Sequence, residues 1–303
     1  MATRIGVGDL RISDRAKQYV NEVLDANRLS YGRFSKQFER EWCRLHDQRF
    51  GVLVNSGTSA LQIGLAALKE KYGWKDGSKV IVPATTFVAS FNVVLQNNLT
   101  PVLVDVDPDT FLIGHEGWPK DAVAVMPVNL YGAVVPSDIY QRAKDAGMKV
   151  ITDSCETALI SHAAGGDITA WSFFACHTVT TGVGGMATTN DPVLAELLRS
   201  LANHGRDGIY ASIDQELGNH EVIEGRFRFQ RPGYSYRLTE MEAAIGCAEL
   251  ETWQANGDAR RRNGDYLIRQ LSDLPLKFPK VNEAVWMFLP VVCDSERERD
   301  SLI

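Results

Sequence analysis

From about residue 50 onward, short apolar runs alternate with longer stretches of helical periodicity. The runs are rich in β-branched residues, as strands are, while the stretches between them repeat apolar side chains every three or four positions. The predicted strands are 51–54, 79–83, 101–107, 122–128 and 149–153, and the predicted helices between them are 59–72, 87–98 and 136–147. This alternation predicts an α/β fold with a mostly parallel central sheet and helices on both faces.

A second strand pair is expected beyond this region. TAWSFFA (169–175) and GMATT (185–189) read as strands, and PVLAELLRSLANHG reads as a helix that Gly205 ends. The polar segment 206–233 has no clear period and is predicted to be a long loop.

The C-terminal part is expected to form a smaller unit. A long helix over 238–254 is followed by a predicted helix in 265–278 and a predicted strand in 284–294. Ser295 and Glu298 have the spacing of a helix capping box just before the last residue. We therefore expect a large α/β domain over residues 1–245, with an N-terminal helical arm over 1–49, and a small, incomplete α+β domain over 246–303.

Composition and charge narrow the class of protein. The chain has 303 residues, of which 45% are hydrophobic and 23% charged, with a formal net charge of −6; these are values of an ordinary globular protein. Since acidic and basic residues are mixed along the chain, no surface for nucleic acid is predicted. No apolar run approaches the roughly 20 residues of a membrane span, and the N-terminus lacks a signal-peptide core, so we expect no membrane partner and a cytoplasmic location.

The cysteines predict no metal site. Five of them, at positions 43, 155, 176, 247 and 293, form no CxxC pair and no metal-ligand spacing. Their odd number fits reduced thiols.

Candidate site residues follow the predicted strands, because ligands of parallel sheets bind beyond the carboxyl ends of the strands. Gly57, Thr58 and Ser59 stand between a strand and an Ala/Leu-rich helix, where backbone N–H groups and the helix dipole favour a phosphate. A simple Ser/Thr helix cap explains the same residues equally well.

Three further strand ends carry candidate chemistry. Phe87 could stack on a flat ring, although a phenylalanine is more often a core residue. Asp153 and Glu156 follow KVIT, and a carboxylate there could pair with a protonated ring nitrogen or cap a helix. Ser172 and His177 precede a glycine turn at 182–185; the hydroxyl could contact a phosphate, and a lone histidine is more often structural than catalytic.

The order and spacing of these segments resemble the DegT/DnrJ/StrS family of sugar aminotransferases, which are pyridoxal-phosphate enzymes of fold type I. The resemblance runs from about Leu29 to the last residues. It includes Ser30-Tyr31-Gly32, Phe38-Glu39-Arg40, Pro101 to Pro108, Asn129-Leu130-Tyr131-Gly132, Asn203-His204-Gly205 and Gly233-Tyr234-Ser235-Tyr236-Arg237.

The resemblance implies a role for each candidate residue. Thr58, Ser59 and Ser172 would hold the cofactor phosphate, and Phe87 would stack on the ring. Asp153 would pair with the ring nitrogen, and Glu156 stands where the family often has glutamine beside the ring hydroxyl. Arg237 would reach the phosphate in a partner subunit's site, which implies a homodimer with sites between subunits.

One position departs from most of the family. His177 stands where the family has the lysine that forms a Schiff base with pyridoxal phosphate, and the sequence has no lysine between Lys149 and Lys277. A branch with this replacement is the sugar 3-dehydratases, which use pyridoxamine phosphate and a histidine base. The resemblance thus implies dehydration at C3 of a nucleotide-linked keto-deoxysugar. Amino transfer from glutamate to such a sugar, and a non-catalytic regulator that binds cofactor or sugar nucleotide, remain alternatives.

Overall fold

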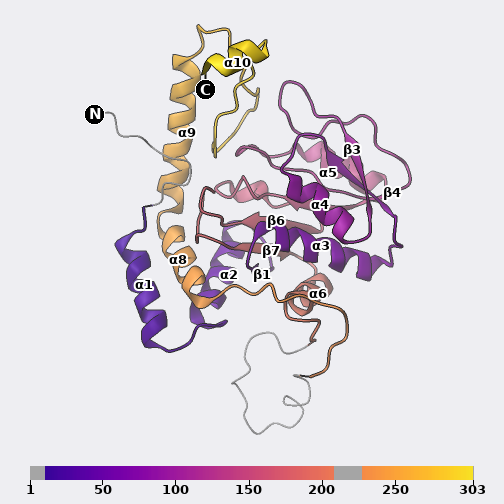
Figure 1. Cartoon of the computed structure of the whole chain (residues 1–303), viewed down its shortest axis with the longest axis vertical. Coiled ribbons are helices and arrows are strands. Elements are labelled where there is room, and N and C mark those ends of the chain that lie inside the picture. Colours follow the sequence, from indigo (N-terminus) through magenta and orange to yellow (C-terminus); the bar gives the residue numbers. More distant parts are fainter. Residues whose placement is uncertain (1–10, 208–226, 303) are drawn as a thin grey trace.

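The computed structural model describes residues 11–207 and 227–302, and it is built around a single seven-stranded sheet (Figure 1). The strand order is β1-β7-β6-β5-β4-β2-β3. The strands are β1 Phe50–Val54, β2 Lys79–Pro83, β3 Thr100–Val104, β4 Ala122–Val125, β5 Lys149–Asp153, β6 Ile168–Ser172 and β7 Gly185–Thr189. The predicted α/β class is confirmed.

Among the strands of the described residues, β7 alone runs in the opposite direction. It pairs antiparallel with β1 and β6, whereas β2, β3, β4, β5 and β6 pair in parallel. The register places Val54 of β1 and Ser172 of β6 opposite the same residue, Gly185, at the start of β7. The carboxyl ends of β1 and β6 therefore meet at one edge of the sheet, next to Asp153 at the end of β5.

Helices cover the sheet and extend beyond it. They are α1 Asp14–Asp25, α2 Arg33–Leu45, α3 Gly57–Tyr72, α4 Val88–Gln96, α5 Ser137–Asp145, α6 Pro192–Ala202, α8 Glu240–Glu251, α9 Trp253–Gln270 and α10 Glu296–Leu302, with a 3-10 turn at Ser161–Ala163. Most of α3 is buried, as its Ala/Leu-rich sequence predicts, and it ends at Gly73 in the left-handed conformation. None of the described helices combines the length and apolarity that crossing a bilayer requires.

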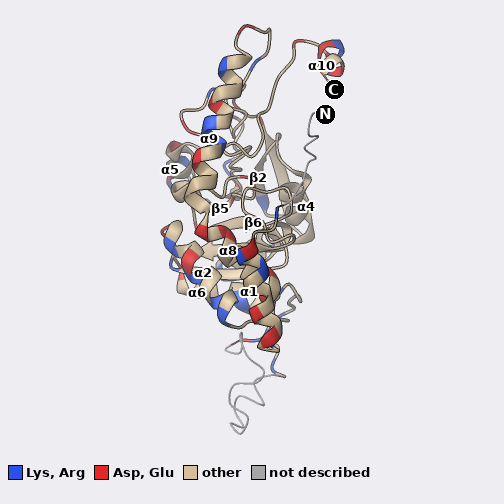
Figure 2. Cartoon of the chain, turned by 90° about the vertical axis from the view of Figure 1, so that its left-hand side faces the viewer, with Lys and Arg blue, Asp and Glu red and all other residues tan. Residues whose placement is uncertain are grey.

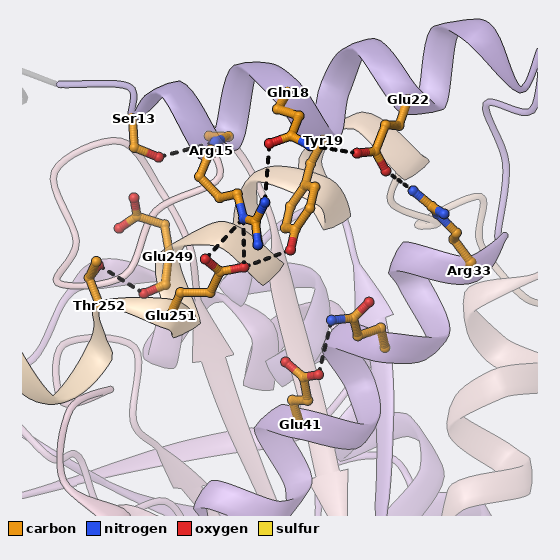
Figure 3. Close-up of polar contacts among 12 residues, drawn as sticks. Ser13, Arg15, Gln18, Tyr19, Glu22, Arg33, Glu41, Glu249, Glu251 and Thr252 are labelled. Atoms are coloured by element: carbon orange, nitrogen blue, oxygen red, sulfur yellow. Dashed lines mark hydrogen bonds and ion pairs between the residues drawn. The ribbon is translucent and has the colours of Figure 1, made fainter.

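The N-terminal helices are attached to α8. Glu251 accepts hydrogen bonds from Arg15 at 3.1 Å and from the Tyr19 hydroxyl at 2.6 Å (Figure 3). The buried carboxylate of Glu240 accepts the backbone N–H groups of Gly32, Phe34 and Ser35. It thereby satisfies the first turn of α2, which has no side-chain cap of its own.

An ion pair between Glu39 and Arg199 supplies hydrogen-bond partners to the edge strand β1. Glu39 of α2 accepts the Leu53 N–H at 3.0 Å, and Arg199 of α6 donates to the Gly51 carbonyl at 2.8 Å. These two side chains pair at 3.0 Å, and the Tyr31 hydroxyl donates to Glu39 at 2.6 Å. The unpaired backbone groups of an edge strand thus have partners, which protects the edge from pairing with another chain.

The C-terminal predictions are only partly right. The predicted helix over 238–254 breaks at Thr252, and its end merges with the helix predicted in 265–278 to form α9. The strand predicted over 284–294 is wrong: this segment makes two isolated bridges, Ala133↔Ala284 and Lys277↔Val292. Pro290 removes a ladder donor from its middle. The capping box is present, since Ser295 Oγ accepts the Glu298 N–H at 3.2 Å.

The loop predicted over 206–233 lies mostly outside the described residues, which omit 208–226. The helix before it, α6, ends at Ala202, and Gly205 follows with a φ of +81°. Figure 2 shows acidic and basic residues interspersed along α1, α8 and α9 rather than segregated by sign.

Candidate active site

A cavity of about 430 Å³ lies at the carboxyl edge of the sheet. Seven of the nine predicted site residues line it: Gly57, Thr58, Phe87, Asp153, Glu156, Ser172 and His177. A larger hollow of about 1000 Å³ opens around Tyr140 and Lys149, at the other end of β5, and none of the predicted residues lines it. The smaller cavity is the candidate site because the candidate chemistry converges there.

The turn from β1 into α3 forms a helix cap and one wall of the cavity. Ser56 is the cap, and its Oγ accepts the Ser59 N–H at 3.0 Å. The Ser59 hydroxyl donates to Asn55 at 2.7 Å, and Ser59 does not line the cavity. Gly57 and Thr58 do line it, and their N–H groups begin the helix without intrahelical acceptors. The helix-cap interpretation is confirmed for Ser56, and a phosphate at Gly57 and Thr58 stays a prediction.

Close packing explains two glycines at this edge. A Cβ on Gly57 would lie 2.6 Å from Cys155 Sγ and 2.7 Å from Ser172 Cβ. A Cβ on Gly185, in the predicted glycine turn, would lie 2.4 Å from the Ser56 backbone. The glycines let β7 and β6 approach the start of α3, so that Ser172 and the helix N-terminus face the same space.

Phe87 is the N-cap residue of α4 and lines one wall of the cavity. Its side chain is 68% exposed, which excludes the alternative of a core residue. A large aromatic ring left exposed at a cavity wall is available to stack on a flat ligand.

Asp153 ends β5 with its carboxylate held by two donors. Oδ2 accepts the Ser90 hydroxyl at 2.7 Å and Oδ1 accepts the Cys155 N–H at 3.1 Å. The residue is 4% exposed and lines the cavity. It is not a helix cap, since no helix begins within the residues that follow it directly.

Glu156 is half-buried in the turn after β5. Its Oε2 accepts the Tyr131 N–H at 2.7 Å. Burial raises the pKa of the Glu156 carboxyl, and the negative charge of Asp153 raises it further, against the hydrogen bond from Tyr131. The protonated form of Glu156 is therefore favoured more than at an exposed site.

His177 sits where the chain turns after β6. Its backbone N–H donates to the Phe174 carbonyl at 2.9 Å, and its ring meets the Phe174 ring edge-on at 6.0 Å between centroids. Its Nδ1 is buried and has no hydrogen-bond partner among the described residues. Burial lowers the pKa of the His177 imidazole, which the Ser172 backbone and the Asp153 charge partly oppose. The neutral ring is the favoured form.

No lysine is present on the cavity wall formed by the described residues. The nearest lysine before His177 in the sequence, Lys149, begins β5 at the other end of the strand and contacts Asp167 at 3.8 Å. Among the described residues that line the cavity, His177 is the one basic side chain.

Arg237 lies outside the cavity of its own chain. Tyr234 and Tyr236 stack on each other at 4.6 Å between ring centroids, and both hydroxyls contact Gln62 of α3. Arg237 is exposed and donates to Ser235 at 3.0 Å. The alternation of this segment therefore directs its tyrosines inward and leaves Arg237 outside.

Several lining residues were not predicted. Val128 ends a predicted strand, and Leu130, Cys155 and Cys176 lie within or between residues of the motifs singled out in the sequence, so their positions could have indicated them. Met287 comes from the C-terminal segment, where its N–H donates to the Tyr131 carbonyl at 3.1 Å. No local sequence signal marks Met287, because only that long-range contact brings it to the cavity.

A model of the DegT/DnrJ/EryC1/StrS aminotransferase family matches residues 11–303. The chain belongs to this family. The resemblance seen in the sequence is thereby confirmed, and so is the prediction of an enzyme of the pyridoxal-phosphate-dependent sugar aminotransferase family.

Two curated relatives are GDP-perosamine synthases. The protein of Caulobacter vibrioides is 33% identical over 304 residues, which cover 94% of this chain and 76% of the relative. The protein of Escherichia coli O157:H7 is 31% identical over 306 residues, covering 96% of this chain and 78% of the relative.

Solved structures of the family share the fold. An E. coli GDP-4-keto-6-deoxy-D-mannose-3-dehydratase with bound hydrated PLP has a TM-score of 0.88 and 25% identity, over 99% of this chain and 82% of that one. A GDP-4-keto-6-deoxymannose-3-dehydratase with a trapped PLP-glutamate geminal diamine has a TM-score of 0.86 and 25% identity, over 97% and 80%. The predicted cofactor is confirmed at the level of the family.

Proposed function

We propose that the cavity binds pyridoxamine phosphate or pyridoxal phosphate, and that the chain removes the C3 hydroxyl of a nucleotide-linked 4-keto-6-deoxysugar. The observation that carries this proposal is His177, which lies in the cavity at the family's lysine position with no lysine beside it among the described residues. Imidazole cannot form a Schiff base but can accept a proton.

The described residues fit such a cofactor. The N-terminus of α3 at Gly57 and Thr58, with the Ser172 hydroxyl beside it, forms a cradle for a phosphate. Phe87 offers its exposed face to the ring, and Asp153 offers a carboxylate to the ring nitrogen. The unpartnered Nδ1 of His177 is a further sign that a polar ligand completes this site.

The roles of the side chains follow from their charge states. When bound, pyridoxamine phosphate supplies an amine that condenses with a keto group and a ring that accepts electrons. His177, held neutral by burial, removes a proton from the carbon beside that amine. Asp153 holds the proton of the ring nitrogen, and Glu156 in its protonated form donates toward the ring hydroxyl.

In the dehydration, the sugar loses its C3 hydroxyl as water and gains hydrogen at C3. The two electrons come from glutamate, which becomes 2-oxoglutarate and releases its nitrogen as ammonia. Glutamate is therefore a second substrate, although the sugar product carries no amine.

The active assembly we propose is a homodimer. Arg237 is exposed beside Ser235 and outside its own cavity, which suits a cation that reaches the phosphate in a partner's site. The location we propose is cytoplasmic.

Amino transfer is a second candidate, because the curated relatives at 33% and 31% identity are GDP-perosamine synthases. In that reaction the glutamate nitrogen stays on C4 of the sugar. His177 argues against it, since the family's amino transfer uses a lysine amine.

Two variants test the proposal. His177→Asn should bind pyridoxamine phosphate with unchanged affinity, which an absorbance titration measures. The same variant should lose C3 dehydration. His177→Lys should form a borohydride-reducible bond to pyridoxal phosphate, which locates residue 177 at the cofactor. Undiminished turnover by His177→Asn would refute the role of His177, and absence of cofactor binding by the wild-type chain would refute the whole proposal.

A further inference from the structure

The buried hydroxyl of Ser90 connects two walls of the cavity. Ser90 lies in the first turn of α4, is 0% exposed and does not line the cavity. Its Oγ donates to Asp153 Oδ2 at 2.7 Å, and its backbone N–H donates to the Phe87 carbonyl at 3.1 Å. One residue therefore joins the aromatic wall, on α4, to the carboxylate at the end of β5.

The direction of these hydrogen bonds follows from the groups involved. An ionised carboxylate only accepts, so the single Ser90 proton goes to Asp153. Thr86 Oγ1 lies 2.8 Å from Ser90 Oγ and must then be the donor of that pair. The chain of donation runs from Thr86, on the cavity wall, through Ser90 to Asp153.

The second carboxylate oxygen is fixed independently. The Cys155 N–H donates to Asp153 Oδ1 at 3.1 Å, from the turn that follows β5. With one donor on each oxygen, rotation of the carboxylate would break both bonds.

We propose that Ser90 is a positioning residue, which holds the Asp153 carboxylate oriented toward the cofactor ring nitrogen. This inference rests on the proposed function, because it needs a ring nitrogen in the cavity. Ser90 contacts the cofactor only through Asp153.

The test compares two ligands in three variants. Dissociation constants are measured by fluorescence titration for pyridoxamine phosphate and for an analogue with carbon in place of the ring nitrogen. Ser90→Ala should weaken binding of pyridoxamine phosphate about tenfold, which corresponds to about 1.4 kcal/mol, because Asp153 loses one of the two donors that orient it. The analogue, which offers Asp153 no partner, should bind Ser90→Ala and wild type equally.

Two further variants control for packing. Ser90→Cys keeps a weak donor of similar size and should show an intermediate loss for pyridoxamine phosphate only. Ser200→Ala removes another fully buried hydroxyl, on α6 and beside Arg231 rather than the cavity, and should affect neither ligand. Melting curves confirm that each variant is folded.

Failure of the role proposed for Ser90 and failure of the proposed function give different results. Equal weakening of both ligands in Ser90→Ala and Ser90→Cys would show a structural role alone and overturn the inference, as would unchanged binding of both. A wild-type chain that binds neither ligand would overturn the proposed function and the inference together.

Discussion

Gly57 leaves no room for a side chain at the start of α3. A Cβ there would lie 2.6 Å from Cys155 Sγ and 2.7 Å from Ser172 Cβ, at the proposed phosphate cradle. We predict that Gly57→Ala weakens pyridoxamine phosphate binding at least tenfold, measured by absorbance titration. Gly257→Ala is the control: its nearest neighbour is 3.8 Å away and it lies within α9, so binding should be unchanged. Equal affinities of Gly57→Ala and Gly257→Ala for pyridoxamine phosphate would contradict the proposal that the phosphate binds at Gly57.

The burial of His177 predicts the pH below which turnover falls. Because burial lowers its pKa below the ordinary 6.5, the neutral base persists at mildly acidic pH and is lost only as pH falls through the lowered pKa. Turnover at saturating cofactor should therefore begin to fall below pH 6.5. A decline that starts above pH 6.5 would rule out His177 as the group that limits the rate.

His46 predicts a loss of stability in acid. Its ring is fully buried against Trp42 and Trp171, and burial lowers its pKa to about 3. The unfolded chain binds the proton near pH 6.5, so the contribution of His46 to stability is full above pH 6.5 and declines as pH falls toward 3. From pH 7 to 5 the loss is on the order of 2 kcal/mol.

Urea unfolding at pH 7 and pH 5 measures this loss, with His46→Gln as the comparison. The variant should lose less stability between the two pH values than the wild type does. Identical pH dependence in both chains would show that His46 does not contribute.

At the level of elements, the stability of the β1 edge depends on the ion pair between Glu39 and Arg199. Glu39→Gln removes the charge that partners Arg199, whose side chain is 24% exposed and bonded to Gly51. Leaving a largely buried charge unpaired costs about 3–5 kcal/mol. We predict that Glu39→Gln lowers the free energy of unfolding by this amount, as measured by urea unfolding.

The exposed ion pair between Lys79 and Asp121 is the control, because Lys79→Gln should change stability by less than about 1 kcal/mol. If Glu39→Gln were as mild as this surface change, the role assigned to the β1 edge would be wrong.

Elements with a strong local signal were predictable, and those set by distant contacts were not. The β5 sequence is apolar and β-branched, so it predicts a strand without any information on distant contacts. The segment 284–294 is equally apolar, yet it is not a strand, because Pro290 interrupts it and its bonds go to Tyr131 and Gly132. The break at Thr252 between α8 and α9 has no such punctuation in the sequence.

The site shows the same division. Gly57, Asp153 and His177 follow strands whose carboxyl ends must meet in a parallel sheet, so order in the sequence was enough to place them together. Ser90 and Met287 reach the site through a buried hydroxyl contact and a long-range backbone bond. Neither contact has a periodicity or motif that sequence could reveal.

At the level of the whole molecule, the proposed dimer predicts complementation between two inactive variants. Arg237→Ala damages the partner's site, whereas His177→Asn damages its own. In a mixed dimer both defects fall on one site and leave the other intact, so random mixing should restore roughly a quarter of wild-type turnover. Subunits mixed after reversible dissociation provide the assay. No recovery above the separate variants would place Arg237 in its own subunit's site or outside any site.

Dehydration and amino transfer differ in where the nitrogen of glutamate ends, and this difference can be measured. The wild-type chain is incubated with pyridoxamine phosphate, a GDP-linked 4-keto-6-deoxysugar and nitrogen-labelled glutamate, and the products are analysed by mass spectrometry. Dehydration should give labelled free ammonia and a sugar lighter by one oxygen atom. A sugar that retains the label as a 4-amino group would contradict it and assign the chain to amino transfer.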